Sequence, residues 1–575
     1  MKWQSLAAAL ALAGCANAPA GGTTWHVDFA DGSNRADGRT PATAWKHAPG
    51  DPKATGAPAS AALKPGDRIL FRAGVPYRGS IVVPASGAQG APIVFSGLGW
   101  GKGMGIIDGS DPVRAARPCT SAADCGGIRA WQGLHRVEFD QPVTQRIILF
   151  GSQGLYYMSQ LPRLPDPFLS DDRRNFESVP AEHLDAVKRG ELVSPALAQA
   201  ARSGGKPELA IWVRPNKVDR RPVLRVEGDS LFFDAEGLQF YESNVPVSLL
   251  GSAAGLGDPG TFFVAGPELI IARLRPGDAA PHLSVGSGRF GIDVDGKHHI
   301  SIEGLRLRNL VGSVASRREG RAITSFRDRA AAIRITGNHI GPAHIEHRSS
   351  AVEFAKVDGL RFTQNRVEDV ALGRGFRVSG KHSTDVLVEG NVLRRVGGTA
   401  LMLWSVHGGV VRGNFLAELA GVHANGITLY LANQDILVEN NCVVTASRPM
   451  TFHGNRTPDV PNRLTIRNNI FVSSPAGQAA INSWGASTVG VLIEGNVLAG
   501  PKLGLLLNES DREIVVRNNV TTRIARQDHA RPDWTIEGNR EDLRYADALK
   551  GEFSEDGCSI PSSGSPLRVV RSRPS

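Results

Sequence analysis

Three hexapeptides in the second half of the chain, LTIRNN (464–469), VLIEGN (491–496) and IVVRNN (514–519), decide the fold. They are copies of one phrase that alternates apolar and polar residues and ends in asparagine. The same asparagine returns at intervals of 27, 26, 23, 27, 28, 27, 23 and 20 residues. A repeat of this length indicates a solenoid, in which equivalent residues of successive coils stack into rows. The repeated residues are Asn338, Asn365, Asn391, Asn414, Asn441, Asn469, Asn496, Asn519 and Asn539.

Each phrase predicts a β-strand followed by a tight turn. The residues three and five positions before the asparagine are apolar, as in Leu464 and Ile466 or Val491 and Ile493. Alternation with a period of two is typical of strands. The Gly-Asn or Asn-Asn pair that follows tolerates left-handed backbone and favours a turn. Stacked asparagine side chains can also hydrogen-bond along their row.

This pattern resembles the right-handed parallel β-helix of the pectate-lyase-like superfamily over roughly residues 290–540. The resemblance implies an all-β fold class: a right-handed parallel β-helix with coils of about 23–28 residues and a small, partly helical elaboration. Because one fold hosts many functions, the resemblance does not decide the activity.

The rest of the chain is expected to extend this solenoid. Lys64–Asp67 (KPGD) and Gly74–Tyr77 (GVPY) resemble the entry segment of exported β-helix carbohydrate enzymes. Residues 179–203 have a helix-like composition and are assigned to an elaboration packed on the early coils. The Ser/Pro/Arg-rich tail after about residue 545 is expected to be loosely ordered. The predicted division is a lipoprotein signal peptide and linker (1–20), a cap with the first coils (21–117), the elaboration (118–289), the regular β-helix (290–545) and the tail (546–575).

The chain begins with MKWQSLAAALALAGC, one lysine followed by an apolar run too short to span a membrane. Such a segment predicts export. Leu12–Cys15 (LAGC) resembles a bacterial lipobox, which implies that Cys15 is lipidated and anchors the protein to the outer membrane, on its periplasmic or surface face. The alternative is ordinary cleavage after Ala18, with a periplasmic or secreted product. No other segment is long and apolar enough to be transmembrane.

The remaining cysteines suit an oxidising compartment. Cys119 and Cys125 lie six residues apart in a polar loop and are predicted to form a local disulfide. Cys442 follows an asparagine pair and is expected near the core, whereas Cys558 has no assignment. No spacing of cysteine or histidine suggests zinc.

The formal net charge of +9 limits the classes of partner that are expected for an exported protein. Nucleic acid is not expected outside the cytoplasm, whereas an acidic polysaccharide or an anionic envelope surface suits a basic protein. A basic excess that serves only solubility is the alternative. A monomer is expected, with no membrane contact beyond the lipid anchor.

A second strand precedes the asparagine strand of each coil, and its apolar residues are assigned to the inside. Alternation then sends their neighbours outward. The inward pairs are Val352/Phe354, Phe376/Val378, Leu401/Leu403, Ile427/Leu429, Met450/Phe452 and Ile481/Ser483. The outward row is Glu353, Arg377, Met402/Trp404, Thr428/Tyr430, Thr451/His453, Asn482/Trp484 and Asn508, and the turns before these strands add Arg374, His423, Asn425 and Arg448.

A row of cations and aromatic rings is unusual for a solvated face and favours a binding groove. Aromatic rings can stack on sugar faces, and arginine can grip carboxylates. The alternative is that loops cover the tryptophans and the charges are ordinary surface. The predicted substrate-binding residues are Arg374, Trp404, Asn425, Arg448, His453 and Trp484.

Cleavage of a uronate chain by β-elimination needs a group that neutralises the carboxylate, a base for the C5 proton and an acid for the leaving oxygen. The row offers suitable residue types over adjacent coils, and the predicted catalytic residues are Arg377, Lys381, His423 and Tyr430. Val378–Ser383 (VSGKHS) resembles the Ser-x-Lys-Ser phrase of the chondroitinase-B and alginate-lyase β-helix family, which implies Lys381 as base. That family also places an arginine on the next coil and calcium-binding acids before the lysine. This chain matches neither, so no cofactor is expected and calcium has no matched ligands.

Three alternatives to a lyase remain open. A β-helix glycoside hydrolase is suggested because Leu256–Phe263 (LGDPGTFF) resembles a degenerate glycosidase phrase. Hydrolysis needs two facing carboxyls, and the row supplies only Glu353 clearly, since Asp369, Asp385 and Asp435 lie in turns. A C5-epimerase would abstract the same proton without elimination. A non-catalytic lipoprotein that binds or guides a polysaccharide would suit most of these features.

Overall fold

The computed structural model describes residues 21–140, 147–163, 176–214, 217–240, 245–312, 317–346, 349–380, 382–421, 423–455, 460–525, 533–560 and 567–570. Two residues singled out by the sequence, Cys15 and Lys381, lie outside these ranges, so the lipid anchor and the role of Lys381 stay predictions. No helix in the described ranges has the length and apolarity needed to cross a membrane.

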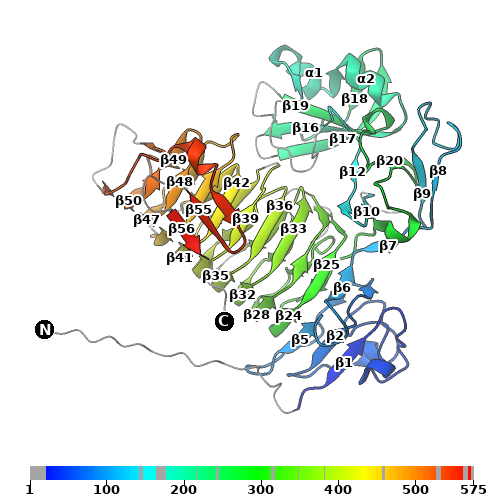
Figure 1. Ribbon diagram of the computed structural model, residues 1–575, viewed down its shortest axis with the longest axis horizontal. Coiled ribbons are helices and arrows are strands. Elements are labelled where there is room, and N and C mark those ends of the chain that lie inside the picture. Colours follow the sequence, from blue (N-terminus) through cyan, green and yellow to red (C-terminus); the bar gives the residue numbers. More distant parts are fainter. Residues whose placement is uncertain are drawn as a thin grey trace.

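The chain winds into a right-handed parallel β-helix with three long sheets (Figure 1). Every strand in these sheets pairs in parallel with its equivalents in the neighbouring coils, as the period predicts. Sheet I carries the asparagine phrases and consists of β1 (Thr24–Val27), β2 (Arg68–Phe71), β5 (Ile93–Ser96), β24 (His298–Glu303), β28 (Ala330–Thr336), β32 (Val357–Thr363), β35 (Ser383–Glu389), β38 (Val406–Arg412), β41 (Gln434–Glu439), β44 (Leu464–Arg467), β47 (Val489–Glu494), β50 (Arg512–Arg517) and β53 (Trp534–Glu537).

Sheets II and III complete each coil. Sheet II contains β4 (Ile81–Val82), β23 (Ile292–Asp293), β27 (Ile323–Ser325), β31 (Ser350–Phe354), β34 (Arg374–Val378), β37 (Leu401–Trp404), β40 (Asn425–Tyr430), β43 (Arg448–His453), β46 (Ala479–Trp484), β49 (Leu503–Leu506) and β52 (Ile524–Ala525). Sheet III contains β3 (Pro76–Tyr77), β6 (Gly105–Asp108), β25 (Leu305–Arg308), β29 (His339–Ile340), β33 (Arg366–Ala371), β36 (Val392–Val396), β39 (Phe415–Ala417), β42 (Cys442–Ala446), β45 (Ile470–Ser473), β48 (Val497–Ala499) and β51 (Val520–Thr521), with β26 (Leu310–Gly312) and β30 (Ala343–Ile345) alongside.

The repeated asparagines form a continuous hydrogen-bonded ladder along the turn after sheet I. Asn414 Nδ2 donates to Asn441 Oδ1 at 2.9 Å, and Asn441 Nδ2 donates to Asn469 Oδ1 at 3.0 Å. The same contact links every successive pair from Asn338 to Asn539. Each Nδ2 also donates to a backbone carbonyl, as from Asn441 to Val411 at 2.8 Å. These buried amides therefore satisfy one another, which explains why asparagine recurs at this position.

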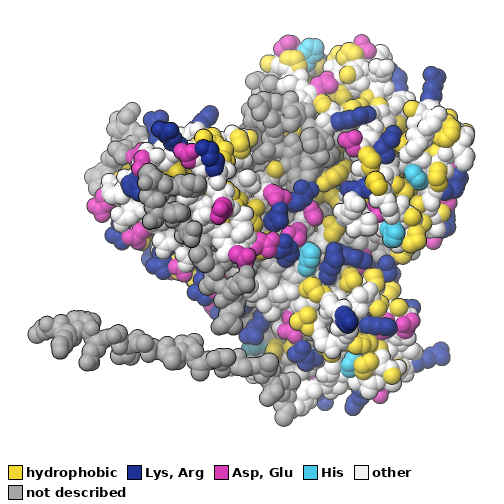
Figure 2. All heavy atoms as spheres, in the orientation of Figure 1, with side chains coloured by type: hydrophobic (Ala, Val, Ile, Leu, Met, Phe, Trp, Pro, Cys, Tyr) yellow, Lys and Arg dark blue, Asp and Glu magenta, His cyan; other side chains and the backbone are white. Residues whose placement is uncertain are grey.

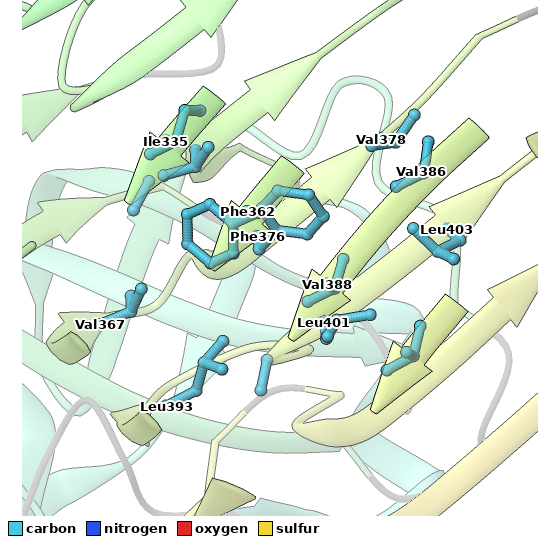
Figure 3. Close-up of a cluster of buried hydrophobic side chains, with 14 of the residues drawn as sticks. Ile335, Phe362, Val367, Phe376, Val378, Val386, Val388, Leu393, Leu401 and Leu403 are labelled. Carbon is cyan, nitrogen blue, oxygen red and sulfur yellow. The ribbon is translucent and has the colours of Figure 1, made fainter. Parts of the chain in front are cut away.

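The apolar core fills the space between the three sheets. Phe362 and Phe376 stack within it with ring centroids 4.5 Å apart, and Val388 and Leu401 come from the next coil (Figure 3). Every inward residue assigned to sheet II from alternation is buried, with Ile427 and Leu429 fully shielded from solvent. The alternation of the sequence therefore identified the inner face correctly. Five residues of the predicted outward row are also buried: Glu353, Met402, Thr428, Thr451 and Asn482.

The chain leaves the coils after β6 and returns at β23, and the intervening insert forms a separate lobe (Figure 1). Its apolar cluster includes Val311 and Ala371 of the coils, so the lobe packs on them. Ser194 begins one of its two helices, because its side chain accepts a hydrogen bond from the Leu197 backbone NH. The insert comprises β7 (Ser110–Pro112), β8 (Ala115–Pro118), β9 (His135–Glu138), β10 (Leu149–Gly151), β11 (Gly154–Leu155), β12 (Tyr157–Met158), β13 (Gln160–Leu161), β14 (Glu177–Val179), α1 (Leu184–Lys188), β15 (Glu191–Val193), α2 (Pro195–Ala201), β16 (Gly205–Arg214), β17 (Lys217–Glu227), β18 (Ser230–Phe233), β19 (Val245–Ser252), β20 (Thr261–Gly266), β21 (Leu269–Arg273) and β22 (Ser284–Gly286).

Two disulfides join the four described cysteines. Cys119 and Cys125 pair within the insert, and Cys442 on the outer face of sheet III pairs with Cys558.

The expectation of a loosely ordered tail is wrong for residues 545–560. This segment, with α3 (Tyr545–Ala548), β54 (Glu552–Ser554) and β55 (Gly557–Ile560), covers an apolar patch of sheet III, and β56 (Leu567–Val570) pairs with β55. Burial of Ile560 and the cross-link explain the order.

Candidate functional site

The outer face of sheet II carries two parallel rows of side chains. The first row runs through the middle of the strands, where Arg377, Met402 and Thr428 are successive Cα partners. It continues through Thr451 and Asn482 to Leu506, whereas Asn508 lies beyond the end of β49. The second row lies at the carboxyl ends of the strands and is defined here as the aromatic row: Trp404, Tyr430, His453 and Trp484.

Rings of the aromatic row contact one another across the coils. Trp404 and Tyr430 lie 5.2 Å apart between ring centroids, and Tyr430 and His453 lie 4.9 Å apart, both edge to face. Trp484 is 40% exposed, which is unusual for so large an apolar side chain. The row therefore offers ring faces along several coils, spaced about 4.8 Å apart by the strands.

Arg448 begins β43 and reaches along the outer face, so that its guanidinium lies 4.9 Å from the Trp484 ring centroid. Its Nε is buried and makes no hydrogen bond, and no acidic side chain of the described chain pairs with it. Burial lowers the pKa of Arg448 from its usual value. Arg448 as a whole is half-buried, and a partly desolvated cation without an acidic partner among the described residues is able to bind an anionic group.

Asn425 is the Cα partner of Arg448 on the preceding strand. It is 2% exposed, its Nδ2 donates to Thr428 Oγ1 at 3.4 Å, and its Oδ1 is buried without a donor. Two neighbouring residues thus present unmet hydrogen-bonding capacity on one face, a donor on Arg448 and an acceptor on Asn425. We define the Arg448 site as Asn425, Tyr430, Arg448, His453 and Trp484.

His453 is electrically neutral in this setting. Burial, and secondly the positive charge of Arg448, lower the pKa of His453 from its usual 6.5 to about 4. A neutral imidazole can accept a proton, and a nearby anion would make that easier by offsetting Arg448. The geometry therefore provides a cation for an anionic group and a neutral base beside it.

Other predicted catalytic residues have different surroundings. Arg377 Nη1 donates to Glu353 Oε1 at 3.1 Å and its guanidinium lies 5.3 Å from the Trp404 ring. Glu353 is 3% exposed and also accepts from Arg321 Nε at 3.3 Å. Glu353 therefore lies between two arginines, and Arg377 has an acidic partner, unlike Arg448.

His423 and Arg374 lie at the amino-terminal ends of their strands. His423 occupies the turn before β40 with φ of 62°, and its carbonyl accepts a hydrogen bond from Thr399 Oγ1 at 3.2 Å. Tyr430 ends β40, about 16 Å from the first residue of that strand and seven residues after His423. Of the two histidines, His453 is therefore the one whose ring contacts Tyr430. The catalytic role of His423 stays a prediction. Arg374 begins β34, and its Cα partner on the neighbouring strand β31 is Ser350.

One acidic residue of this face escaped the sequence analysis. Asp293 points outward between the buried Ile292 and Val294, in the row that continues through Thr324 to Glu353. Burial raises its pKa, and Arg318 Nε lies 2.6 Å from its carboxylate. The coil of Asp293 lacks the asparagine phrase, because Leu305 stands at the ladder position beside Asn338. The apolar–Asp–apolar alternation is the one local signal that could have revealed it.

The described residues contain no group of three or more His, Cys, Asp or Glu side chains arranged to hold a metal ion.

Comparison with known proteins places the fold. The profile of a family described as right handed beta helix region matches residues 322–520, and no curated protein matches the sequence. A solved glycoside hydrolase superposes with a TM-score of 0.52 at 12% identity, over 91% of this chain and 98% of its own. XylC in complex with xylose gives 0.44 at 11% identity, over 87% and 75%. A GH136 lacto-N-biosidase from Eubacterium ramulus gives 0.34 at 10% identity, over 90% and 67%. The family profile and the superposition on the glycoside hydrolase show the architecture: the chain is a right-handed parallel β-helix.

Proposed function

We propose that this protein is a polysaccharide lyase that cleaves an acidic, uronate-containing polysaccharide by β-elimination at the Arg448 site. The observation that carries the proposal is the half-buried Arg448, which pairs with no acidic side chain of the described residues and lies beside a neutral histidine. The same fold occurs in a glycoside hydrolase, which agrees with a carbohydrate ligand. The fold does not decide the reaction.

In this mechanism Arg448 receives the carboxylate of the uronate sugar. Its guanidinium supplies the charge-assisted hydrogen bonds that match a carboxylate, and these strengthen as negative charge develops on the carboxylate in the transition state. The free Oδ1 of Asn425, at the opposite end of β40 from Tyr430 and about 16 Å away from it, accepts a hydrogen bond from a hydroxyl of another sugar of the chain. Trp484 stacks on the sugar ring or its neighbour, which excludes water from the site.

His453 then removes the proton from C5, and Tyr430 donates a proton to the oxygen that leaves C4. The C5–H and C4–O bonds break, a C4–C5 double bond forms, and the two protons end on His453 and on the leaving oxygen. The His453 and Tyr430 rings lie 4.9 Å apart, so both can reach one sugar. Such acid–base assistance contributes about 10²–10⁴-fold to rate.

The protein is expected to bind a uronate oligosaccharide at least about tenfold more tightly than the same oligosaccharide with its carboxylates reduced to alcohols, because a hydrogen bond to a charged group contributes about 1.5–3 kcal/mol. Titration calorimetry measures both affinities. Arg448→Gln should remove the preference, whereas Arg467→Gln should keep it, since Arg467 pairs with Glu439 on the outer face of sheet I. Equal affinity for the two oligosaccharides would rule out a carboxylate receptor.

The acid limb of the kcat/KM profile is expected near pH 4, because the pKa of His453 in the free protein is about 4 and the base must be unprotonated. The acid limb of the kcat profile should lie at a higher pH than that of the kcat/KM profile, since the bound carboxylate offsets Arg448 and raises the pKa of His453. Arg448→Gln removes one of the two causes that lower the pKa of His453, so the acid limb of the kcat/KM profile should move to higher pH. A limb that keeps its position in Arg448→Gln would show that another group titrates.

Hydrolysis is the second candidate, and Asp293 favours it. Asp293 and Glu353 lie two coils apart in one row, about 9.6 Å between their Cα atoms. This spacing is close to the upper end of the roughly 6.5–9.5 Å between carboxyls of inverting glycosidases. Burial raises the pKa of Asp293, as an acid catalyst requires, but arginines engage both carboxylates. Loss of activity in Asp293→Asn, with Arg448→Gln unaffected, would favour this reaction.

A further inference from the structure

We propose a second ligand site, for a small oxyanion, in the cavity between the insert and the outer face of sheet III. The cavity measures about 240 Å³, and its charged lining residues are Arg78, Arg306, Arg308 and Asp108, with His282 beside them. Lys and Arg side chains gather with His and acidic side chains where the upper lobe meets the early coils (Figure 2).

One ion pair in the cavity is already complete. Asp108 is 1% exposed and accepts hydrogen bonds from Arg308 Nε at 2.9 Å, from Ser110 Oγ at 2.6 Å and from Asn309 Nδ2 at 3.2 Å. Its oxygens are therefore occupied by these hydrogen bonds, and its single negative charge, which also acts on Arg306, faces the three arginines of the cavity. The cavity therefore keeps an excess of positive charge.

Neither remaining arginine has an acidic partner within the part of the chain that the structure describes. Arg306 Nε is buried without a hydrogen bond, and burial, and secondly the charge of Arg308, lower the pKa of Arg306. Arg78 donates its Nε to the Ser110 carbonyl at 3.2 Å, which leaves its terminal nitrogens for a ligand. Arginine forks match carboxylate, phosphate and sulfate oxygens, so an oxyanion is the ligand that relieves this excess charge.

Paired strands of the coils position both arginines. Arg306 stands on β25, whose Cα partner on β6 is Ile106, and Ile106 in turn pairs with Pro76, two residues before Arg78. The insert closes the opposite wall with Leu283 and Ser284, whose hydroxyl oxygen lies 2.8 Å from Ser110 Oγ and can donate to it. A bound oxyanion would therefore bridge the coils and the insert and stabilise their packing.

This site is distinct from the Arg448 site. It lies on sheet III at β25, five strands and about 24 Å from the coil of β42 and β43. The oxyanion could come from a uronate sugar or from free inorganic phosphate or sulfate, which share the same recognition chemistry.

The test measures binding and melting temperature of the full protein with sodium phosphate, sodium sulfate, glucuronate and neutral glucose at constant ionic strength. At least one oxyanion is expected to bind and raise the melting temperature, and Arg306→Gln should raise its Kd at least tenfold. Arg334→Gln, an exposed arginine of β28, is the matched control and should bind as the wild type does.

The outcomes separate the sources and the two sites. Binding of glucuronate alone assigns the site to a sugar carboxylate, whereas binding of phosphate or sulfate assigns it to a free oxyanion. Each ligand is also titrated against Arg448→Gln, which disables the Arg448 site. Oxyanion binding that remains in this variant and is lost in the Arg306→Gln/Arg448→Gln double variant belongs to the cavity, whether or not the lyase proposal holds. If Arg306→Gln does not fold, Arg78→Gln replaces it. The proposal is overturned if no oxyanion binds, if glucose binds equally well, or if the arginine variants bind as tightly as the wild type.

Discussion

Replacing Arg448 by glutamine is expected to lower kcat/KM on the preferred uronate polymer by about 10²–10³-fold, the loss typical of removing one preorganised group that stabilises transition-state charge. Glutamine keeps much of the volume over Trp484 but carries no charge. The carboxylate would then lack its cation when the C5 proton leaves. Steady-state kinetics on the same polymer measures the effect.

Arg467→Gln supplies the control for Arg448→Gln. Arg467 also follows the coil period, but it lies on sheet I and is paired with Glu439 at 2.8 Å. Its replacement is expected to leave kcat/KM within about twofold, since surface ion pairs contribute little. Nearly wild-type activity in Arg448→Gln would remove Arg448 from the mechanism.

Replacing Ile427 by aspartate is expected to destabilise the β-helix by more than about 4 kcal/mol, because it places an unpaired charge in a packed apolar core. Ile427 is fully buried and lies between Leu401 and Met450 of the neighbouring strands. Loss of β-type circular dichroism, or a large drop in the midpoint of denaturant unfolding, measures the effect. Leu437→Asp is the control, since Leu437 points outward from sheet I and an aspartate there stays hydrated. Equal stability of the two variants would show that the faces of the coil are misassigned.

Much of the fold could be predicted because the physics repeats in every coil. A buried asparagine amide needs partners, and an asparagine one coil away supplies them, so the residue must recur with the period of the coil. Alternation is equally direct, since Ile427 and Leu429 can only be buried if Thr428 and Tyr430 point outward. Local patterns therefore determined both the coil and its faces.

Other features depended on contacts between distant residues. Cys442 and Cys558 are 116 residues apart, and nothing in either neighbourhood indicates that the tail crosses sheet III. Whether Arg448 has an acidic partner among the described residues likewise depends on every surrounding coil. Asp293 was overlooked because its coil replaces the ladder asparagine with leucine.

Ultraviolet absorbance of the reaction products tests the central claim most directly. β-Elimination leaves a C4–C5 double bond conjugated with the carboxylate, so the wild-type protein acting on alginate, polygalacturonate, glycosaminoglycans or the producer's own exopolysaccharide should generate absorbing chain ends in step with new reducing ends. His453→Gln should abolish both signals together. New reducing ends without absorbance would contradict the lyase and support hydrolysis. Binding with neither signal would contradict cleavage altogether, and exchange of the C5 proton with deuterated water would then separate an epimerase from a guiding protein.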